Sequence, residues 1–512
     1  MNMNHSKYIL CAILSLTLCM GAFVGCAKEK NSETETEIST ENTPSDTVVE
    51  NETEAPDPFA DFDYNGQSFR VYTSTHDASD SLKSSNYLIE GPEEMTGEAV
   101  SDAAFERNAY VEELLNVDLN FTDSNLSYDK VQNDVRSYIM AGADDYELII
   151  NDLYGLTSLT LEGMFYSADE GEYFDFTKPY WYGNFMKDIA FRQGDTFMMA
   201  GDFIVDTLRT AHCLIYNKDL YENLYGDRNA LYDIVLSGGW TLDKMTELVD
   251  GAYIDTNGNG QKDIGDTIGF GACQDWGPFI PFSVSTGVEY FGRDEEGFPT
   301  ITMNNERTIE MCDKVYDLWH SIGTGAYAMF NSDQPLVLEQ FTAGNMLIIG
   351  YQQLGCLESD FLRVSEHEIG VIPYPKLDDK QENYITSAHD TSEIGLLPKT
   401  MPQDRLSFAS AVLEVLSRES GRNVLPLYYE NALKIKYTRD AQSAQMIDII
   451  HDGIGNCFVL AWHQPLSTFL QNLIQVSAMN ENTFSSNYAK MEKTLHEKLA
   501  KMIETYRENN AN

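Results

Sequence analysis

The chain has 512 residues, of which 43% are hydrophobic, and its formal net charge is −47. This charge argues against binding to nucleic acid, because DNA and RNA phosphates are contacted by Lys and Arg. It argues equally against attachment to an anionic membrane surface through basic residues. Beyond an N-terminal stretch of about sixty residues, roughly 450 residues remain, which is enough for two or three domains.

Residues 1–25 have the pattern of a secretory signal peptide. A polar start carrying Lys7 precedes an almost wholly apolar run from Tyr8 to Val24, and Gly25 lies at the expected cleavage point. The stretch FVGC ending at Cys26 resembles the lipobox of bacterial lipoproteins, with Phe in place of the usual Leu. The alternative is an uncleaved membrane anchor, although the run is shorter than the ~20 residues that a spanning helix prefers. We therefore expect an acylated Cys26 and a protein anchored by lipid to the extracellular face of the cell membrane.

Residues 26–60 are predicted to form an acidic, flexible linker. They are rich in Glu, Thr, Ser, Asn and Pro, and almost no aromatic residue precedes Phe59. Such a composition buries too little apolar surface to offset the entropy of ordering the chain. The linker would hold a folded body away from the membrane.

Five cysteines remain once the signal peptide and Cys26 are set aside. They are odd in number, widely spaced and never in a CxxC pair, which predicts neither a disulfide framework nor a zinc site. We expect most of them to be buried as small apolar residues, with one disulfide left open; they are Cys213, Cys273, Cys312, Cys356 and Cys457.

The first part of the folded body alternates between strand and helix. Strands are predicted at 68–73, 117–122 and 146–150, and helices at 101–116, where Ser101 and Asp102 suit an N-cap, and at 128–141. This order predicts a parallel sheet covered by helices. Ligands bind beyond the carboxyl ends of such strands.

Two loops meet that description in the first region. They are 73–77, which contains His76, and 151–154, which contains Asp152. Each polar residue there has an alternative role as a helix cap or turn former.

A second α/β region follows. A strand is predicted at 210–217, a helix at 241–252 with Thr241 as its N-cap, and a helix at 308–322. The remaining predicted elements are strands at 345–351, 368–373 and 392–398, then helices at 405–418 and 487–509.

Four stretches, in order, resemble the extracellular solute-binding proteins of ABC importers, the type that includes maltose-binding protein. The first two are YELIIND at 146–152, and QGDTF at 193–197 followed by LIYNKDL at 214–220. The others are FTAGNM at 341–346 with IGY at 349–351, and IGVIPYP at 369–375 with IGLL at 394–397. Together they span about residues 65 to 430.

The resemblance implies a two-lobed α/β fold of the periplasmic-binding-protein type, with hinge strands joining the lobes and a ligand between them. Lobe one would comprise 62–203 and 370–425, and lobe two 204–369 and 426–512. The implied function is delivery of a solute, expected to be a sugar or oligosaccharide, to ABC permease subunits. A ligand drives closure of the lobes only through its higher affinity for the closed state.

Sugar rings offer apolar faces and many hydroxyl groups, which aromatic rings and polar side chains match. The large aromatic residues have an alternative role in the core, where we place Trp240 and Trp319. The aromatic candidates for ligand binding lie in loops or near strand ends and are Trp181, Trp276, Tyr351 and Trp462. By approximate position, the resemblance gives the polar candidates His76, Asp77, Asp152, Gln352, and Asp390 with His389 before it.

One local motif predicts a calcium ion with a structural role. Oxygen-bearing side chains follow EF-hand spacing over twelve residues, with Gly260 at the sharp turn and Asp rather than Glu at the last position, as in dockerin modules. The alternative is a polar turn without an ion. The predicted ligands are Asp255, Asn257, Asn259, Gln261, Asp263 and Asp266.

Signatures of catalysis are missing from the sequence. It contains no GxSxG elbow, P-loop Lys or HExxH motif, so we expect a binding protein rather than an enzyme. Two alternatives stay open: a surface glycan-binding protein without a transporter, and a secreted carbohydrate hydrolase. The 81 acidic residues always allow a carboxylate pair to be imagined, so such a pair proves nothing.

Overall fold

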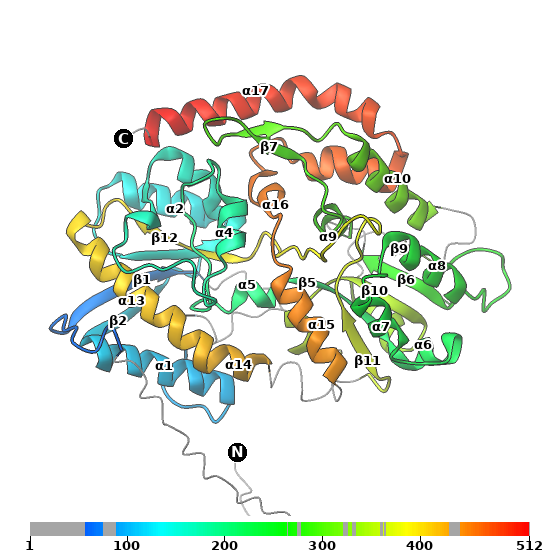
Figure 1. The fold of residues 1–512 in the computed structure, drawn as a ribbon, viewed down its shortest axis with the longest axis horizontal. Coiled ribbons are helices and arrows are strands. Elements are labelled where there is room, and N and C mark those ends of the chain that lie inside the picture. Colours follow the sequence, from blue (N-terminus) through cyan, green and yellow to red (C-terminus); the bar gives the residue numbers. More distant parts are fainter. Residues whose placement is uncertain are drawn as a thin grey trace, which may run out of the picture. The chain divides into compact units, whose positions relative to one another are not determined.

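In the computed structural model, the residues described are 57–74, 89–263, 265–273, 278–320, 326–329, 334–358, 362, 365–429 and 441–510. They include two five-stranded sheets with helices around them (Figure 1). The predicted mixed α/β class is therefore confirmed.

The first sheet has the strand order β2-β1-β3-β12-β4. β1 pairs in parallel with β2 and β3, as the alternation of strands and helices predicts. β12 returns late in the chain and pairs antiparallel with β3 and β4. The strands are β1 Gln67–Thr73, β2 Val117–Asp123, β3 Leu148–Asp152, β4 Phe165–Tyr166 and β12 Glu393–Pro398, with α1 Ala99–Leu115 and α2 Tyr128–Met140 between the first three.

The N-terminus of α1 differs from the prediction. Glu98, rather than Ser101 or Asp102, is the N-cap, and its side chain accepts from the backbone N–H groups of Val100 and Ser101. Asp102 instead accepts from the backbone N–H groups of Thr96 and Gly97. The helix ends at Asn116, which adopts the left-handed conformation that Asn tolerates, so the chain turns directly into β2.

The second sheet has the order β11-β5-β10-β6-β9. Its strands are β5 His212–Asn217, β6 Ile268–Cys273, β9 Ala326–Met329, β10 Met346–Gln353 and β11 Ile369–Ile372. β11 pairs antiparallel with β5, so a division of the chain by sheets falls after Ile372, whereas the predicted boundary of lobe one falls at residue 370. The helices of this region are α6 Lys218–Tyr225, α7 Ala230–Leu236, α8 Leu242–Ala252, α10 Glu306–His320 and α11 Gln334–Thr342.

α8 shows how sequence sets these helices. Thr241 is its N-cap, as predicted, and accepts from the backbone N–H of Lys244 at 3.3 Å. The residues that face the core recur at helical spacing; they are Leu242, Met245, Leu248, Val249 and Ala252. Trp240, just before the helix, and Trp319 in α10 are buried, so their predicted place in the core is confirmed.

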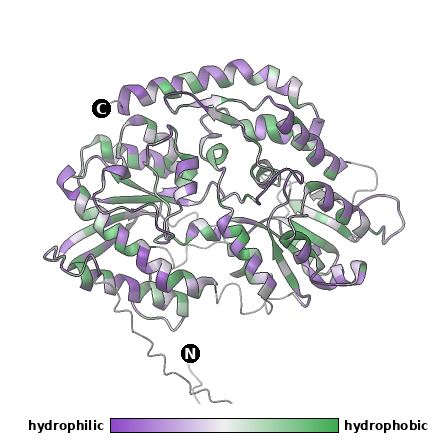
Figure 2. Cartoon of the chain, viewed as in Figure 1, coloured by the Kyte–Doolittle hydropathy of each residue, from purple (hydrophilic) through white to green (hydrophobic). Residues whose placement is uncertain are grey.

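The last third of the chain is helical. The long helix α17 has apolar residues on one side and charged residues on the other, which Figure 2 shows as alternating green and purple. Within the described ranges, no helix combines the length and apolar character needed to cross a membrane. The helices are α13 Leu406–Glu419, the π-helix η5 Ser420–Val424, α14 Leu425–Tyr428, α15 Ala441–Asp452, α16 Phe458–Trp462, the π-helix η7 Leu470–Glu481 and α17 Phe484–Asn510.

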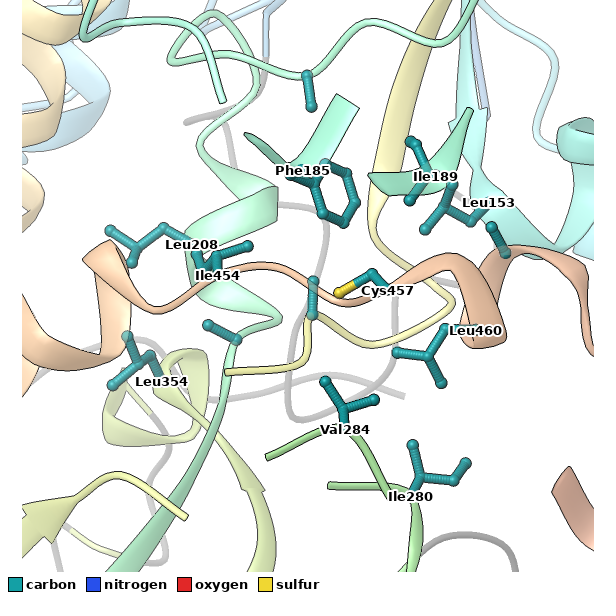
Figure 3. Packing of buried hydrophobic residues seen from close by; sticks show 14 of the residues in the cluster. Leu153, Phe185, Ile189, Leu208, Ile280, Val284, Leu354, Ile454, Cys457 and Leu460 are labelled. Carbon is teal, nitrogen blue, oxygen red and sulfur yellow. The ribbon is translucent and has the colours of Figure 1, made fainter. Parts of the chain in front are cut away.

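Several segments pass between the two sheets and pair with one another. Ala211 forms a bridge with Ala388, and Thr386 forms one with Ile454. Around these crossings, side chains from short helices near both sheets converge on the segment that carries Ile454, Cys457 and Leu460 (Figure 3). The hydrophobic core therefore continues through the crossings. The short helices near them are α3 Leu153–Leu156, α4 Gly183–Ile189, α5 Asp206–Arg209 and α9 Ile280–Ser285, with a small hairpin of β7 Phe291–Arg293 and β8 Pro299–Ile301 farther on.

The cysteines behave as small core residues. Cys213, Cys312, Cys356 and Cys457 are buried thiols, as expected for most of this set. Burial raises the pKa of Cys312 and of Cys457, which keeps both thiols protonated. The side chain of Cys273 lies outside the described residues.

Candidate functional site

The carboxyl end of β3 carries Asp152, which directly precedes the short helix α3. Its side chain caps that helix by accepting from the backbone N–H of Gly155 at 2.6 Å. The cap fixes the carboxylate at the edge of the sheet, where ligands bind in parallel α/β folds. The two roles that the sequence left open for Asp152, helix cap and cleft residue, are therefore compatible.

The chain segment before β12 is held against this edge by backbone hydrogen bonds. The N–H of Tyr154 donates to the carbonyl of Asp390, and that of Leu153 donates to the carbonyl of Ser392, both at 3.0 Å. On the other side, the N–H of His389 donates to the carbonyl of Thr210 at 3.0 Å. The segment 389–392 is thereby held both to β3 and to the residues just before β5.

Asp390 lies between two histidines. Its Oδ1 is 2.9 Å from Nδ1 of His389, and its Oδ2 is 3.4 Å from Nε2 of His463, while only 4% of the residue is exposed. Burial by itself raises the pKa of Asp390, but the two histidines more than offset this and hold the pKa well below its usual value. Asp390 is therefore a buried carboxylate that stays ionised at neutral pH.

These residues line a cavity of about 470 Å³, which we call the first cavity. This volume is within the roughly 300–1,000 Å³ typical of small-molecule sites. Oε1 of Gln471, from the π-helix η7, is buried there without a hydrogen-bond partner in the described part of the chain. The lining residues are Asp152, Tyr154, His389, Asp390, Thr391, His463, Thr468 and Gln471.

Three further ionisable side chains, those of Glu393, Asp206 and Arg209, lie close together behind this edge of the first sheet. The N–H of Glu393 donates to Oδ2 of Asp206 at 3.3 Å, and Nη1 of Arg209 is 3.6 Å from Oδ1 of the same Asp206. Burial, followed by the charges of Asp206 and Asp152, raises the pKa of Glu393 well above its usual value. Glu393 thus holds a proton more tightly than an exposed Glu, which limits the negative charge behind the cavity.

His212 supports the crossing as a neutral side chain. Its Nδ1 lies 2.8 Å from Oγ of Ser387 and 3.1 Å from the carbonyl of the same residue. Burial, together with nearby His389, lowers the pKa of His212 to about 3. At neutral pH, His212 therefore adds no positive charge to the surroundings of Asp390.

Comparison with known proteins finds no match to a family model or to a curated protein. Solved structures match over most of the chain. UgpB from Mycobacterium tuberculosis, solved with glycerophosphocholine, has a TM-score of 0.52 at 13% identity and covers 86% of this chain and 99% of its own. A cyclo/maltodextrin-binding protein with maltotetraose has 0.52 at 12%, covering 86% and 97%. An ABC transporter solute-binding protein from Thermotoga lettingae with α-D-tagatose has 0.51 at 9%, covering 85% and 100%.

The chain has the fold of ABC-transporter solute-binding proteins. At 9–13% identity the likeness concerns the fold, and the predicted two-lobed architecture is confirmed. The matched structures are covered almost completely, so the resemblance extends over whole proteins rather than over one lobe.

Within this solute-binding-protein fold, two of the predicted ligand-binding aromatics are core residues. Trp462 is fully buried, and its indole N–H donates to the carbonyl of Ile189 at 2.8 Å. Trp181 is also buried, and its indole N–H donates to Oε2 of Glu414 at 2.9 Å. Neither ring lines the first cavity, because both pack against neighbouring aromatic side chains.

The remaining predicted ligand-binding residues belong to β10 or lie outside the described residues. Gln352 is buried at the end of β10, where its Nε2 donates to the carbonyl of Gly350 at 3.1 Å, and it does not line the first cavity. Tyr351 belongs to β10, but its side chain is not described. His76, Asp77 and Trp276 lie outside the described residues.

Most of the far wall of the first cavity was not predicted from the sequence. His463, Thr468 and Gln471 come from the segment after α16, and no local pattern marks them as ligand residues. His463 is 73 residues from its partner Asp390 in sequence. The run AWHQP, in which the polar His463 directly follows a core tryptophan, is the nearest thing to a signal. It does not indicate which residue His463 contacts.

The predicted calcium loop folds on itself through its own oxygen atoms. Oδ1 and Oδ2 of Asp255 accept from the N–H groups of Gly258 and Gly260, at 2.7 and 2.8 Å. Asp263 accepts from the side-chain amides of Asn257 and Asn259. Gly260 has a φ of +73°, which suits the sharp turn.

The last predicted ligand, Asp266, is the most buried of the set. Its carboxylate accepts from the N–H of Thr256 and from the hydroxyl of Tyr253. In the ranges that the structure describes, no three His, Cys, Asp or Glu side chains are grouped to hold a metal. An ion would therefore also need amide and backbone oxygens, which Asn257, Asn259 and Gln261 carry, and calcium remains a prediction.

Proposed function

We propose that the protein is a lipid-anchored, extracellular solute-binding protein that delivers a sugar or oligosaccharide to an ABC importer. The observation that carries the proposal is the first cavity, where Asp152 and Asp390 lie together at the carboxyl edge of the first sheet. The fold supports it, because proteins solved with maltotetraose and with α-D-tagatose share this fold.

The chemistry of the first cavity suits a ligand with many hydroxyl groups. Ionised Asp390 and Asp152, the N-cap of α3, are acceptors for hydroxyl donors, and hydrogen bonds to charged groups are the stronger ones. Thr391, Thr468 and Gln471 add side chains that both donate and accept. Tyr154 supplies the one phenol ring among the described lining residues, and such a ring matches the apolar face of a sugar.

The anchoring part of the proposal comes from the sequence. The apolar run to Val24 and the lipobox-like end at Cys26 support export and acylation, and residues 26–60 support a flexible tether. Cys26→Ala is expected to abolish incorporation of labelled palmitate and to release the protein from the membrane fraction. Unchanged labelling of the variant would contradict the anchor.

The calcium ion enters the proposal as a structural element. With calcium at about 100 times its dissociation constant, binding adds roughly 2.7 kcal/mol of stability. We expect calcium to raise the melting temperature over that in a chelator, and Asp263→Asn to remove most of this rise. Lys262→Gln, next to Asp263, is the matched control and should keep it. Equal melting temperatures with calcium and with chelator would contradict the ion site.

The function is tested by melting the full chain, purified in detergent, against a panel of mono- and oligosaccharides. A ligand at about 100 times its dissociation constant again adds roughly 2.7 kcal/mol, which shifts the melting temperature by a few degrees. The expected result is a shift with one class of sugar and no breakdown of that sugar on long incubation. Product formation would indicate a hydrolase instead, and a panel without any shift would remove the sugar assignment.

A further inference from the structure

A second cavity of about 1020 Å³ lies away from the first and shares no lining residue with it. Its walls come from residues 58–59, the loop 172–180, the end of α13 with the π-helix η5, and His451 of α15. α15 packs against β11 of the second sheet, whereas α13 packs against α1 of the first region. An occupant would therefore touch elements from both parts of the fold.

Asp202 is the polar residue that sets this cavity apart. Its backbone N–H donates to the carbonyl of Tyr180 at 2.9 Å, which places the side chain against the π-helix. A Cβ on Gly421 would lie 2.6 Å from Oδ2 of Asp202, so the carboxyl is admitted only because Gly421 has no side chain. The residue is 4% exposed and lines the cavity. Its Oδ1 makes no hydrogen bond of full geometry among the described residues, and the neutral hydroxyl of Tyr182 is the polar group beside its carboxyl.

The other carboxylates of the wall are satisfied by the protein itself. Oε1 of Glu414 accepts from the hydroxyl of Tyr180 at 2.6 Å, and its Oε2 accepts from the indole N–H of Trp181. Asp175 pairs with Lys178 at 3.4 Å. These groups need no ligand, in contrast to Asp202.

The basic residues of the wall are likewise engaged. Arg418 donates to both carboxylate oxygens of Asp57, at 3.0 and 2.7 Å. Arg422 pairs with Glu419 at 3.0 Å. Since neither guanidinium is paired with Asp202, the described wall of the cavity presents a buried carboxyl without a counter-charge.

Aromatic rings make up much of the remaining wall. Tyr173, Phe174 and Tyr180 line the cavity and are each partly exposed. Phe59 packs edge-on against Tyr173, with ring centroids 5.8 Å apart, and this contact steadies the Tyr173 ring. Aromatic faces carry negative partial charge and attract cations, most strongly where water is excluded.

We propose that the second cavity binds an organic cation, a primary or quaternary ammonium compound, whose charge pairs with Asp202 and whose methyl or methylene groups pack on Tyr173 and Tyr180. A cation supplies a counter-charge that no described side chain gives to Asp202, and the aromatic rings add to the attraction. A sugar phosphate or other anion would gain no such charge pairing with Asp202. The site is separate from the sugar site and does not depend on it.

The pH dependence of binding follows from the burial of the carboxyl. Burial raises the pKa of Asp202 to about 8, so at neutral pH the apo carboxyl is mostly protonated. Tyr182 and Tyr429 face it, and burial raises the pKa of both hydroxyls, so they stay neutral throughout this range. A cation requires the ionised form, so its affinity should rise about tenfold per pH unit below pH 8 and level off above it.

The remaining charged groups of the wall are Glu172, Asp175, Lys178, Glu414, Arg418, Arg422 and His451. His451 is the one histidine among them, and its Nδ1 is 3.0 Å from Oδ1 of Asp452. The Asp202→Asn variant removes the carboxyl and leaves His451 in place, so it isolates the contribution of Asp202.

The test is calorimetric titration of the full chain in detergent with choline at pH 6.5, 7.5 and 8.5. The matched neutral probe is 3,3-dimethylbutan-1-ol, which has the shape of choline without its charge. We expect choline to bind at least tenfold more tightly than the alcohol at pH 8.5, with affinity falling by about tenfold per unit below pH 8. Asp202→Asn should abolish this preference and its pH dependence.

Asp390→Asn is the variant that tells the two cavities apart. It should leave choline binding unchanged, just as Asp202→Asn should leave any sugar binding unchanged. Equal binding of choline and the alcohol, no binding of choline at pH 8.5, or a loss of choline binding in Asp390→Asn would each overturn the proposal. If Asp202→Asn does not fold, the comparison of choline with the alcohol on the unmodified protein decides alone.

Discussion

Asp390 and Asp202 are equally buried, at 4% exposure, but lie in opposite electrostatic settings. Asp390 lies between His389 and His463, which hold its pKa below the usual value. Burial, with no cation beside the carboxyl among the described residues, raises the pKa of Asp202 to about 8. Depth of burial therefore does not decide whether a carboxyl is charged. The partners that the fold supplies decide it, and a carboxyl without such a partner is where a charged ligand has most to offer.

The largest effect that we expect comes from removing a partner of Asp390. His463→Ala should lower the free energy of unfolding by about 3 to 5 kcal/mol, because it leaves a buried charge less compensated. Denaturant unfolding at pH 7 measures this loss. A decrease below about 1 kcal/mol, the size expected for an exposed ion pair, would show that His463 is not an important partner.

Removing the carboxyl of Asp202 should change the pH profile of stability. Its folded pKa of about 8 is above the unfolded value, so the folded state holds the proton more tightly and stability falls as pH rises from about 4 to 8. Between pH 5 and pH 7 this costs about 3 kcal/mol. Asp202→Asn should therefore gain about 3 kcal/mol relative to the unmodified protein over that interval, as measured by unfolding at both pH values. A constant difference between the two proteins would place the pKa of Asp202 in its ordinary range.

Asp390 should show the opposite sign. Its folded pKa is below the unfolded value, so its contribution to stability is present above about pH 4 and is lost as pH falls further. Asp390→Asn should thus be destabilised most at neutral pH and converge with the unmodified protein in acid. Together, these two profiles test whether the contrast between the cavities is electrostatic.

The affinity for the sugar offers a further way to distinguish Asp390 from Asp202. For the sugar that shifts melting most, Asp390→Asn should weaken binding by about 10- to 100-fold, the size of losing a hydrogen bond to a charged acceptor. Calorimetric titration measures this, and Asp202→Asn is the control that should bind the sugar normally. Equal losses in both variants would mean that the sugar is not held in the first cavity.

The smallest effect is expected at the rim of the second cavity. His451 pairs with Asp452, whose side chain is 80% exposed. His451→Ala should change the free energy of unfolding by no more than about 1 kcal/mol, because solvent screens such pairs. A larger loss would indicate that His451 packs into the structure more than its ion pair suggests.

Much of the fold was predictable because local signals agree with it. The strand predicted at 117–122 is observed at Val117–Asp123, and the helix predicted at 241–252 is observed at Leu242–Ala252 after the expected Thr241 cap. Apolar periodicity and turn residues fix such elements within the chain itself. The antiparallel return of β12 and its pairing with β3 are long-range choices that no local pattern encodes.

The residues of the candidate site likewise fall into two groups, those that local sequence signals predict and those that only long-range folding brings together. Asp152 and Asp390 were predictable because each lies at the end of, or just before, a strand with a clear signal. His463 and Gln471 were not, because helices far along the chain bring them to the first cavity. Trp181 and Trp462 are cases in which a sequence signal pointed to ligand binding but the side chain lies in the core. A tryptophan in a loop-like stretch suggests a binding platform, but both rings are buried.

Asp202 shows what neither pattern nor resemblance indicates. In the sequence it stands in the run MMAGDF, which reads as an ordinary turn. Its significance appears only when Gly421, 219 positions later, lets the π-helix approach its carboxyl (421 − 202 = 219). The burial of this carboxyl is a property of the assembled fold.

The most direct test of the central claim is a crystal structure of the chain grown with the sugar that raises its melting temperature most. We predict that sugar density lies in the first cavity, with hydroxyl groups within hydrogen-bonding distance of Asp152 and Asp390. Density for the sugar in the second cavity, or on the surface with the first cavity holding only water, would contradict the account.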